Sequence, residues 1–333
     1  MNRNIIFSAL LCFIIILFIA DKILWSKTSV KPRSLNSMEI LDVIRRDCGA
    51  LCNTLRSGSN GLFFNYVEAP IDCKALFNNE YIDRGHGFQN APKEIPQEML
   101  NDFTMNNRVG VKTFYFNQPY LNKKARTPLW SIEMIKQYIS SAERGELRGT
   151  YGVSETNALR RALQHAPRIK NGRVLVIGTE IPWVEACALE AGAREVVTLE
   201  YGKIVSEHPK VSTMTPHDFR LRYLNNTLGR FDAIITFSSI EHSGLGRYGD
   251  ALNPWGDIIA VAKAWCVTKL GGSLTISVPY NYNQDSIRFN AHRVYGKIRY
   301  PFLTSNWKQV YKGSEKQIDH GYGGPQTVFV FRK

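Results

Sequence analysis

The chain has 333 residues, of which 44% are hydrophobic and 11% aromatic, and its 42 Lys and Arg exceed its 29 Asp and Glu to give a net charge of +13. These values are ordinary for a globular protein and exclude a disordered chain. The sequence contains no run of five basic residues and no repeat of basic and aromatic residues, so we expect no nucleic-acid partner. The positive charge instead suits an anionic substrate or an anionic lipid surface.

The first feature along the chain is an apolar segment at residues 5–20, which carries no charge. As a helix it rises about 24 Å, and residues 23–25 extend it toward the hydrocarbon thickness of about 30 Å. A cleaved signal peptide is the alternative, but the bulky Phe18 stands where a cleavage site needs a small residue. We predict an uncleaved single-pass membrane anchor at 1–25 and a polar stalk at 26–36. The rest of the chain is then expected in the lumen of the endoplasmic reticulum or Golgi.

The next stretch is predicted to form an irregular extension. A helix is expected to begin near Ser37, which can cap its first turn, and to end at Gly58. Its apolar residues recur every three or four positions, as in a helix with one buried face. Residues 59–126 show no sustained period and contain one strand-like piece, Lys112 to Phe116. Residues 37–126 are therefore predicted to be an α+β extension of unknown role.

Five cysteines lie beyond the apolar segment. Cys48, Cys52 and Cys73 are close in the sequence, so they predict either one disulfide in an oxidising lumen or three unpaired residues. Cys187 and Cys266 lie in apolar helical stretches and are predicted to be buried thiols.

From residue 127 the pattern becomes regular and predicts an α/β domain over 127–333. A helix is expected from Thr127, with Pro128 at its first position. Residues 214–219 are interpreted as a strand end or turn. The other predicted helices cover residues 154–165, 180–193 and 258–270. The predicted strands cover residues 173–178, 195–201, 231–238, 271–280 and 326–333. Apolar strands that alternate with helices indicate a parallel sheet with both faces covered.

Polar residues follow the predicted strands at the edge where an α/β sheet binds its ligands. In such sheets ligands bind beyond the carboxyl ends of the strands, at the switch point. Gly178 follows the first strand, and Glu200 follows the second strand 22 residues later. That spacing is typical of a carboxylate that accepts both ribose hydroxyls of a nucleoside. Ser239, Glu241 and His242 follow the next central strand and are expected at the same edge.

Residues 170–280 resemble the class I S-adenosylmethionine-dependent methyltransferases. VLVIGTE takes the place of their first glycine-rich motif, FDAIITFSSIEH resembles their fourth strand, and TKLGGSLTISVP resembles their fifth. The resemblance implies a Rossmann-like parallel sheet and S-adenosylmethionine as cofactor, with Glu200 on the ribose and Asp218 near the adenine. The cofactor-binding residues that it implies are Gly178, Thr179, Glu200, Asp218 and Ser239.

A second, narrower resemblance covers most of the predicted lumenal part. FSSIEHSGLGRYGDALNPWGD and FNAHRVYGKIRYP resemble an uncharacterised membrane-anchored family of nematodes and plants, a domain of unknown function first described in Caenorhabditis. That family brings no established activity.

The first glycine-rich motif departs from the methyltransferase pattern. Gly178 is followed by Thr179 and Glu180, so the second glycine is missing, and Glu180 would repel the carboxylate of methionine. Two further interpretations therefore stay open. The site binds an altered nucleotide or a nucleotide sugar, or it binds no ligand.

The residues after the fourth strand and after the last core strand carry candidate groups for chemistry. His242 suits a general base, because unperturbed imidazole titrates near about pH 6.5, or the Glu-His pair only shapes the pocket. The candidate catalytic residues are His242, Glu241 and His292. The candidate substrate-binding residues are Arg247, Tyr248, Asp250 and Arg293. The alternative for Asp250 is a structural role, in which its hydrogen bonds close the loop. His242, Asp250 and His292 lack tight ligand spacing, so we predict no metal site.

These residues predict a methyltransferase that faces the secretory lumen and acts on a small-molecule or glycan acceptor. The first alternative is a non-catalytic protein of the same fold that binds or scaffolds a partner at a secretory membrane. A sugar-nucleotide-dependent glycosyltransferase is the second alternative, but no Asp-x-Asp motif occurs in the chain.

Overall fold

The computed structural model describes residues 36–60, 66–83, 92–116, 127–313, 321 and 323–333. The predicted membrane anchor and all but the last residue of the predicted stalk lie outside these ranges. Residues 41–333 form one compact unit, and residues 1–40 form a separate unit. Among the described residues, no helix has both the length and the apolar character needed to cross a membrane.

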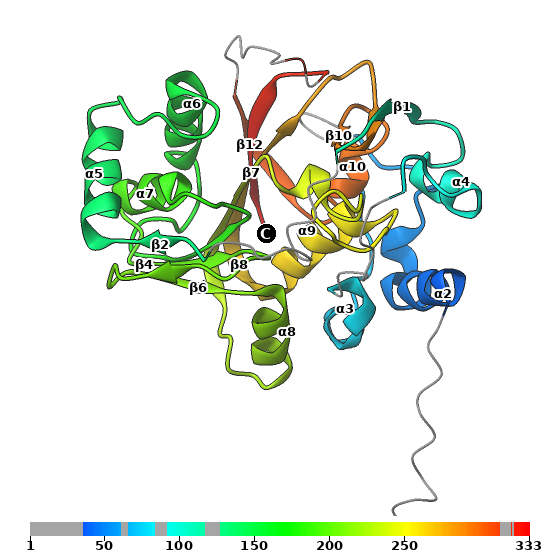
Figure 1. Cartoon of the computed structure of the whole chain (residues 1–333), viewed down its shortest axis with the longest axis horizontal. Coiled ribbons are helices and arrows are strands. Elements are labelled where there is room, and N and C mark those ends of the chain that lie inside the picture. The colour runs from blue at the N-terminus through cyan, green and yellow to red at the C-terminus, as the bar shows by residue number, and fades with distance from the viewer. Residues whose placement is uncertain (1–35, 61–65, 84–91, 117–126, 314–320, 322) are drawn as a thin grey trace, which may run out of the picture. The chain divides into compact units, whose positions relative to one another are not determined.

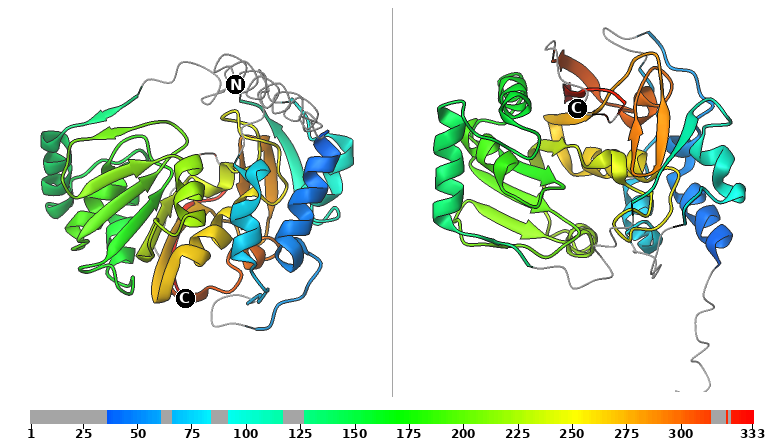
Figure 2. Two further views of the ribbon diagram at one scale, coloured as in Figure 1. Left: turned by 90° about the horizontal axis from the view of Figure 1, so that it is seen from below. Right: turned by 45° about the horizontal axis from the view of Figure 1, so that its top comes forward.

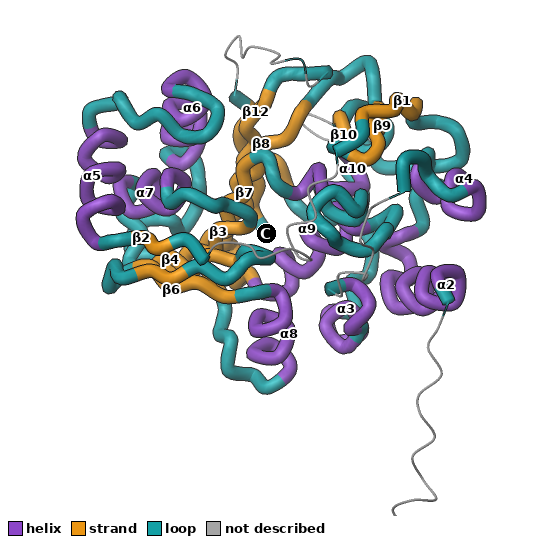
Figure 3. The backbone as a smooth tube through the Cα atoms, viewed as in Figure 1, coloured by secondary structure: helices purple, strands orange, loops and turns teal. Residues whose placement is uncertain are grey.

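The core of the compact unit is a mixed sheet (Figure 1 and Figure 3). Its strands are β3 (Arg173–Ile177), β4 (Glu195–Leu199), β6 (Val211–Met214), β7 (Phe231–Phe237), β8 (Thr268–Pro279), β11 (Lys308–Lys312) and β12 (Gln326–Arg332). Their order across the sheet is β11-β12-β8-β7-β3-β4-β6. The five strands from β8 to β6 run parallel, whereas β12 is antiparallel to β8 and β11 is antiparallel to β12. Because two antiparallel pairings restore the direction, β11 runs the same way as these five strands, and only β12 is reversed. The prediction of a parallel sheet is therefore wrong only for the possible last strand at 326–333, and β11 was not predicted.

The chain direction places a switch point next to β3. From β3 the chain moves outward to β4 and β6, and it then returns to β7 on the other side of β3. The antiparallel β12 is inserted between β8 and β11. Six strands of the sheet therefore run in one direction, and the one reversed strand is inserted among them. The carboxyl ends of β3 and β7 are therefore where this sheet is expected to bind a ligand.

Helices cover both faces of the sheet (Figure 1 and Figure 2). The α-helices of the described residues are α2 (Ser37–Cys48), α3 (Cys73–Asn78), α4 (Leu100–Phe103), α5 (Ile132–Glu143), α6 (Val153–Leu163), α7 (Trp183–Glu190), α8 (Pro216–Leu224), α9 (Gly256–Val267) and α10 (Tyr300–Leu303). Of these, α5, α6 and α7 pack on one face of the sheet, and α3, α8, α9 and α10 pack on the other. Alternate residues of a strand point to opposite faces. Val174 and Val176 pack in the hydrophobic cluster of α5, α6 and α7, whereas Leu175 packs in the cluster of α3, α8 and α9. This two-sided burial explains the nearly continuous apolar runs of the strands.

The predicted extension packs on this core. The ring of Phe77 in α3 stacks on Tyr223 of α8, with centroids 3.7 Å apart. A disulfide joins Cys73 of α3 to Cys266 of α9, and Lys263 of α9 donates to both carboxylate oxygens of Asp83 at 2.8 Å. Residues on α3 and in the loop after it are therefore tied to the helix layer that covers β7 and β8.

The disulfides differ in part from the prediction. Cys48 and Cys52 form one disulfide, as the cysteine cluster predicted. Cys266 is bonded to Cys73 across 193 positions of sequence, so the prediction of a free thiol at Cys266 was wrong. No local sequence pattern predicts this pairing, because the two residues meet only in the folded helix layer. Cys187 is a free, buried cysteine, as predicted.

Two smaller sheets complete the fold. The first contains β1 (Gly110–Phe114), β9 (Ser286–Asn290) and β10 (His292–Val294), with β1 parallel and β10 antiparallel to β9. The second pairs β2 (Leu129–Trp130) with β5 (Val205–Ser206). The side-chain amide of Asn290 exchanges two hydrogen bonds with the backbone of Phe116, which joins the extension to the end of β9.

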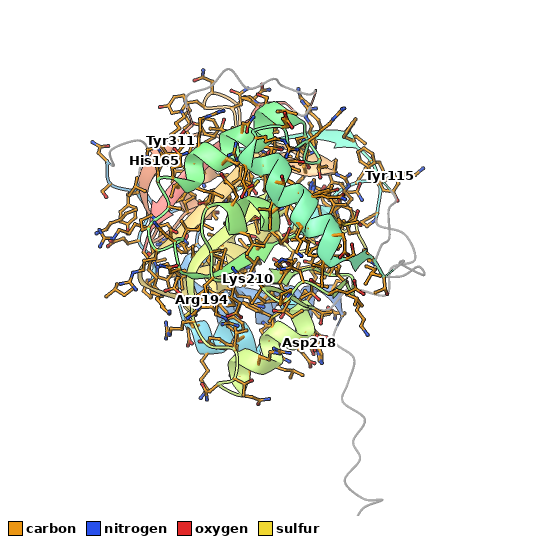
Figure 4. All side chains as sticks on the ribbon, turned by 90° about the vertical axis from the view of Figure 1, so that its left-hand side faces the viewer. Tyr115, His165, Arg194, Lys210, Asp218 and Tyr311 are labelled. Atoms are coloured by element: carbon orange, nitrogen blue, oxygen red, sulfur yellow. A yellow bond between two sulfur atoms is a disulfide. The ribbon has the colours of Figure 1, made fainter. Side chains whose placement is uncertain are left out.

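Several element boundaries differ from those predicted. The helix expected from Thr127 begins at Ile132, with Ser131 as its cap, because Leu129 and Trp130 pair with β5. Residues 214–219 contain the start of α8, which the sequence reading missed. The strand β11 was also missed, and its Tyr311 stacks on His165 after α6, with centroids 4.3 Å apart (Figure 4).

Candidate functional site

The carboxyl ends of β3, β4 and β7 meet at the switch point. The backbone N–H of Gly178, just after β3, donates to the Leu199 carbonyl at the end of β4 at 3.0 Å. On the other side, the backbone N–H of Ser238, just after β7, donates to Ser277 of β8 at 2.9 Å. The loops that carry the candidate residues therefore start from fixed positions on the sheet.

Gly178 is required by the contact between two of these loops. Its φ is +77°, a left-handed conformation that side chains with a Cβ rarely adopt. A Cβ atom at this position would lie 1.8 Å from the Oγ of Ser239. Ser239 thus packs directly on the backbone of Gly178. The predicted cofactor-binding residues Gly178 and Ser239 are in contact, and packing alone accounts for the glycine.

Glu200 lies at the end of β4, as predicted, with its carboxylate turned back to the chain. Its Oε1 accepts a hydrogen bond from the backbone N–H of Tyr201 at 2.7 Å. The pKa of Glu200 is raised to about 7, chiefly by burial and with a smaller contribution from the Glu180 carboxylate, against the opposing effect of the backbone N–H groups of Tyr201, Gly202 and Thr179. Glu200 is therefore close to the loop after β3. Because its pKa is near neutral pH, a small change in its surroundings changes whether the carboxylate is charged.

The loop after β3 is held by its own chain. The hydroxyl of Thr179 donates to the Ile181 carbonyl at 2.5 Å, and the indole of Trp130 donates to the Glu180 carbonyl at 3.1 Å. The side chain of Glu180 is exposed. Thr179, a predicted cofactor residue, thus uses its hydroxyl to shape the loop, and the loop presents an acid where the family pattern has a glycine.

Glu241 lies after β7, is fully buried, and belongs to a polar network with the partly buried Ser238. Its Oε1 accepts from the Ser238 hydroxyl at 2.7 Å, and the side-chain amide of Gln326 on β12 donates to the same hydroxyl at 3.0 Å. Burial raises the pKa of Glu241 to about 7, although the Ser238 hydroxyl and Arg247 favour the charged form. Sequence reasoning found Glu241 and missed Ser238 and Gln326, since Gln326 reaches this place only by the antiparallel pairing of β12 with β8.

His242 is a neutral hydrogen-bonding group in this structure. Its Nδ1 lies 2.6 Å from the Ala291 carbonyl, so Nδ1 carries the proton and Nε2 is left as the acceptor. Burial and, to a smaller extent, the nearby Arg247 lower the pKa of His242 to about 3. Its ring lies edge-on to His292, with centroids 6.3 Å apart. The three predicted catalytic residues are therefore brought together, but His242 is a weak base here.

Arg247 is stacked between two aromatic rings. Its guanidinium carbon lies 4.4 Å from the ring centroid of Phe116 and 4.9 Å from that of Tyr248. Its Nη1 lies 3.4 Å from the Ala291 carbonyl, and Tyr248 is edge-on to His242 at 5.6 Å. Burial raises the pKa of the Tyr248 hydroxyl to about 12, so it is a donor at neutral pH. The predicted substrate residues Arg247 and Tyr248 lie against the predicted catalytic ones.

Two other predicted substrate residues hold the loop. Asp250 accepts from the backbone N–H groups of Gly244, Gly246 and Tyr248, at 2.8, 3.3 and 3.2 Å. This is the loop closure that the sequence offered as the alternative for Asp250. Arg293 is buried and donates to the carbonyl of Ser243 at 2.6 Å.

Asp218, the predicted adenine contact, lies at the start of α8 (Figure 4). Its carboxylate accepts from the Thr215 hydroxyl at 2.8 Å, and its backbone N–H donates to the same hydroxyl at 3.3 Å. The two residues form a capping box, which stabilises the first turn of the helix. The adenine contact stays a prediction.

Another buried acid near the site was missed. Glu185 of α7 accepts from the Thr198 hydroxyl of β4 at 2.7 Å, and burial raises its pKa to about 8. The signal was a lone acid in the otherwise apolar WVEACAL. Within the described ranges, no group of three His, Cys, Asp or Glu side chains is placed to hold a metal ion.

One family model matches part of the chain. Residues 170–320 match the family model described as Caenorhabditis protein of unknown function, DUF268. No curated protein matches the chain. The matched residues contain Glu200, Glu241, His242 and His292, and they end before Gln326.

Among solved structures, the chain is similar to several methyltransferases. The 1,6-didemethyltoxoflavin-N1-methyltransferase of Burkholderia thailandensis is 16% identical over 60% of this chain and 86% of its own, with a TM-score of 0.35. An S-adenosylmethionine-dependent methyltransferase of Mesorhizobium loti is 13% identical over 53% and 98%, with a TM-score of 0.34. The N-methyltransferase NodS of Bradyrhizobium japonicum is 13% identical over 54% and 94%, with a TM-score of 0.35.

Proposed function

We propose that this chain is an S-adenosylmethionine-dependent methyltransferase whose nucleoside site is at Glu200. The observation that carries the proposal is the position of Glu200, an acid at the end of β4, one strand away from the switch point beside β3. The strand order with a reversed β12 supports it. Fold alone does not determine activity, so the argument rests on the acid and its surroundings.

The residues fit the nucleoside half of this cofactor. An ionised carboxylate offers about four lone-pair sites, and the hydrogen bond from the backbone N–H of Tyr201 occupies one of them. Two ribose hydroxyls can therefore donate to Glu200. The methionine end fits less well, because Glu180 follows Gly178 and would repel the methionine carboxylate. The residues therefore fit the nucleoside half of the cofactor and not its methionine half.

Other residues are proposed to define the acceptor side. When bound, the cofactor supplies an electrophilic methyl group. The chain itself supplies Arg247, fixed over Phe116 and Tyr248, and the neutral imidazole of His242. A guanidinium fixed by stacking suits a carboxylate or another anionic group on the acceptor. We therefore propose a small-molecule or glycan acceptor that carries such a group.

We further propose that the protein is anchored in a secretory membrane by residues 1–25 and that its folded part faces the lumen. Two disulfides support this location, because disulfides form and persist in oxidising compartments. Their positions in α2 and between α3 and α9 are inside the compact part of the chain.

A second candidate function is a non-catalytic binding protein at the same membrane. The observation in its favour is the contact of Ser239 with Gly178, which packs a side chain against the loop where a cofactor would approach the backbone. Asp250 and Arg293 also form hydrogen bonds with the backbone of the loop after β7, so these polar groups stabilise the loop.

Calorimetric titration of the full chain, in a mild detergent, with S-adenosylhomocysteine separates the two functions. The methyltransferase predicts saturable binding that Glu200→Gln weakens about 10- to 100-fold, the loss of one or two hydrogen bonds to a charged group. The matched control is Glu207→Gln, an exposed acid beyond β5, which should bind like the unmodified protein. Absence of binding by folded protein would favour the non-catalytic function.

A further inference from the structure

Two buried oxygen atoms at the end of β7 and the start of β12 lack a hydrogen-bond partner. They are Oε2 of Glu241 and Oε1 of Gln326, and neither has a partner among the described residues. Both residues are buried, with exposed fractions of 0% and 2%. Buried polar atoms in folded proteins are nearly always paired, so two unpaired atoms in one network call for an explanation.

The two oxygens belong to the same hydrogen-bonded unit. The Ser238 hydroxyl has one proton, which it donates to Oε1 of Glu241, and it accepts from the amide nitrogen of Gln326. In this orientation the amide of Gln326 also lowers the pKa of Glu241, because an amide N–H group favours the charged carboxylate. Carboxylate and amide oxygens only accept hydrogen bonds. The unit therefore contains one donor fewer than its acceptors need.

Turning the Gln326 amide over does not supply the missing donor. In that orientation the amide nitrogen can donate to Glu241, but the amide oxygen then faces the Ser238 oxygen, 3.0 Å from the present nitrogen position. The Ser238 proton can serve only one of its two neighbours. In either orientation of the amide, one acceptor is left without a donor.

We propose that Glu241 carries this missing proton, that Gln326 accepts it, and that Glu241 rather than His242 is the group that exchanges a proton with a ligand at this site. A carboxylic acid at Glu241 donates from Oε2 to Oε1 of Gln326, which pairs both orphaned atoms at once. Gln326 is then a positioning residue that acts through Glu241. Ser238 holds the other carboxyl oxygen.

The charged and titratable groups around Glu241 permit this state. Arg247 favours the charged form, Tyr248 and Tyr295 interact with the carboxyl group, and Arg293 donates to the Glu241 carbonyl at 3.4 Å. Nε2 of His242 lies 3.9 Å from Oε1 of Glu241. Burial is the largest influence, and it raises the pKa of Glu241 to about 7.

The same surroundings make His242 unsuitable for carrying the proton. Its Nδ1 proton is bound to Ala291, and burial beside Arg247 lowers its pKa to about 3. A proton-transfer group works best when its pKa is near the working pH, which Glu241 meets and His242 does not. The site therefore has a carboxylic acid that can give up or regain one proton and a neutral imidazole that accepts a hydrogen bond.

The first test compares unfolding of the full chain with that of Glu241→Gln from pH 4.5 to 8. The raised pKa means that the folded protein keeps its proton above the ordinary glutamate value of 4.5. The stability that the acid contributes is fully present below 4.5 and is lost as pH rises toward about 7. The unfolding constant of the unmodified protein, relative to that of the variant, should rise about tenfold per pH unit over this range.

Two controls make this result specific. Glu185 and Glu200 also have raised pKa values, but they are present in both proteins and cancel from the ratio. Glu133→Gln, an exposed acid on α5, should show no such pH trend. A ratio for Glu241→Gln that is flat over the whole range would show that Glu241 is ionised in the folded protein and would overturn the proposal.

The second test observes the proton directly and needs no unfolding. Infrared difference spectra of the unmodified protein against Glu241→Gln should show the carbonyl stretch of a carboxylic acid at pH 6, replaced by carboxylate bands above pH 8. Gln326→Leu removes the acceptor of the proton and should move this midpoint down by about one pH unit, the worth of one hydrogen bond. Carboxylate bands at every pH, or a midpoint that Gln326→Leu leaves unchanged, would contradict the proposal.

Discussion

Glu200 and Glu241 lie at the same edge of the sheet, but the chain holds them in different ways. Backbone N–H groups, led by that of Tyr201, surround the Glu200 carboxylate. Glu241 instead accepts from the Ser238 hydroxyl, which in turn accepts from the Gln326 amide. Burial raises the pKa of both acids to about 7. An acid held by backbone donors is prepared to be charged. In the proposed state of Glu241, the Ser238 hydroxyl donates to one carboxyl oxygen and the Gln326 oxygen accepts from the other, so the acid keeps its proton.

The largest expected effect comes from removing the ion cluster behind Glu241. Asp257 is fully buried and accepts from Arg299 at 2.6 and 2.8 Å. Arg293 lies 3.7 Å from Asp257 and donates to the carbonyl of Ser243, in the loop after Glu241. Asp257→Ala leaves two buried guanidinium groups without a carboxylate and should destabilise the protein by about 3–5 kcal/mol in urea unfolding.

The control for this change is Asp42→Ala, which removes an acid from an exposed pair with Arg45. Exposed pairs contribute about 0–1 kcal/mol, so this variant should unfold almost like the unmodified protein. If Asp257→Ala lost no more stability than Asp42→Ala, the cluster would not support the Glu241 loop.

The second prediction concerns the contact where the Glu200 and Glu241 sides meet. Gly178→Ala places a Cβ against Ser239 and forces a side-chain-bearing residue into a φ of +77°. Backbone strain of about 1–3 kcal/mol and overpacking of similar size should together destabilise the protein by about 3 kcal/mol.

The pairwise part of this loss is measurable by a double-mutant cycle. Ser239→Gly removes the obstructing side chain. In the Gly178→Ala background it should therefore restore the stability lost to overpacking, but not the stability lost to backbone strain. Strictly additive losses in the two variants would mean that the loops separate easily and that Gly178 serves another purpose.

The third prediction uses pH to separate the two acids. Ribose hydroxyls donate to a carboxylate, so Glu200 must be ionised to bind them, and below its pKa of about 7 each unit of pH should weaken S-adenosylhomocysteine about tenfold. Calorimetric titration at pH 5.5, 6.5 and 7.5 measures this slope. Glu241→Gln should keep the slope, and Glu200→Gln should give weak binding that does not depend on pH.

Much of the fold was accessible from the sequence because the strands are apolar on both faces. The runs at 173–178 and 231–238 predicted β3 and β7 almost to the residue. The capping box at Thr215 and Asp218 lies in a stretch rich in charged and polar residues without a clear apolar period, so α8 was missed. The helix predicted from Thr127 was displaced because a two-residue pairing with β5 outweighed the favourable Pro128 start.

The site was accessible only where its residues follow strands directly. Glu200, Glu241 and His242 were found because each is placed by the end of a parallel strand. Gln326 was not found, because its contact with Ser238 depends on the reversed direction of β12, which no local pattern reveals. The pairing of Cys73 with Cys266 was missed for the same reason, since packing of α3 on α9 creates it.

The smallest expected effect separates a structural from a binding role for Asp218. Asp218→Ala removes half of the capping box and should destabilise the protein by about 1 kcal/mol. Thr215→Ala removes the other half by a similar amount but leaves the Asp218 carboxylate in place. If the cap is the whole role of Asp218, the two variants bind S-adenosylhomocysteine equally well. Weaker binding in Asp218→Ala alone would show that this carboxylate contacts the adenine and that the ligand extends from Glu200 across to β6.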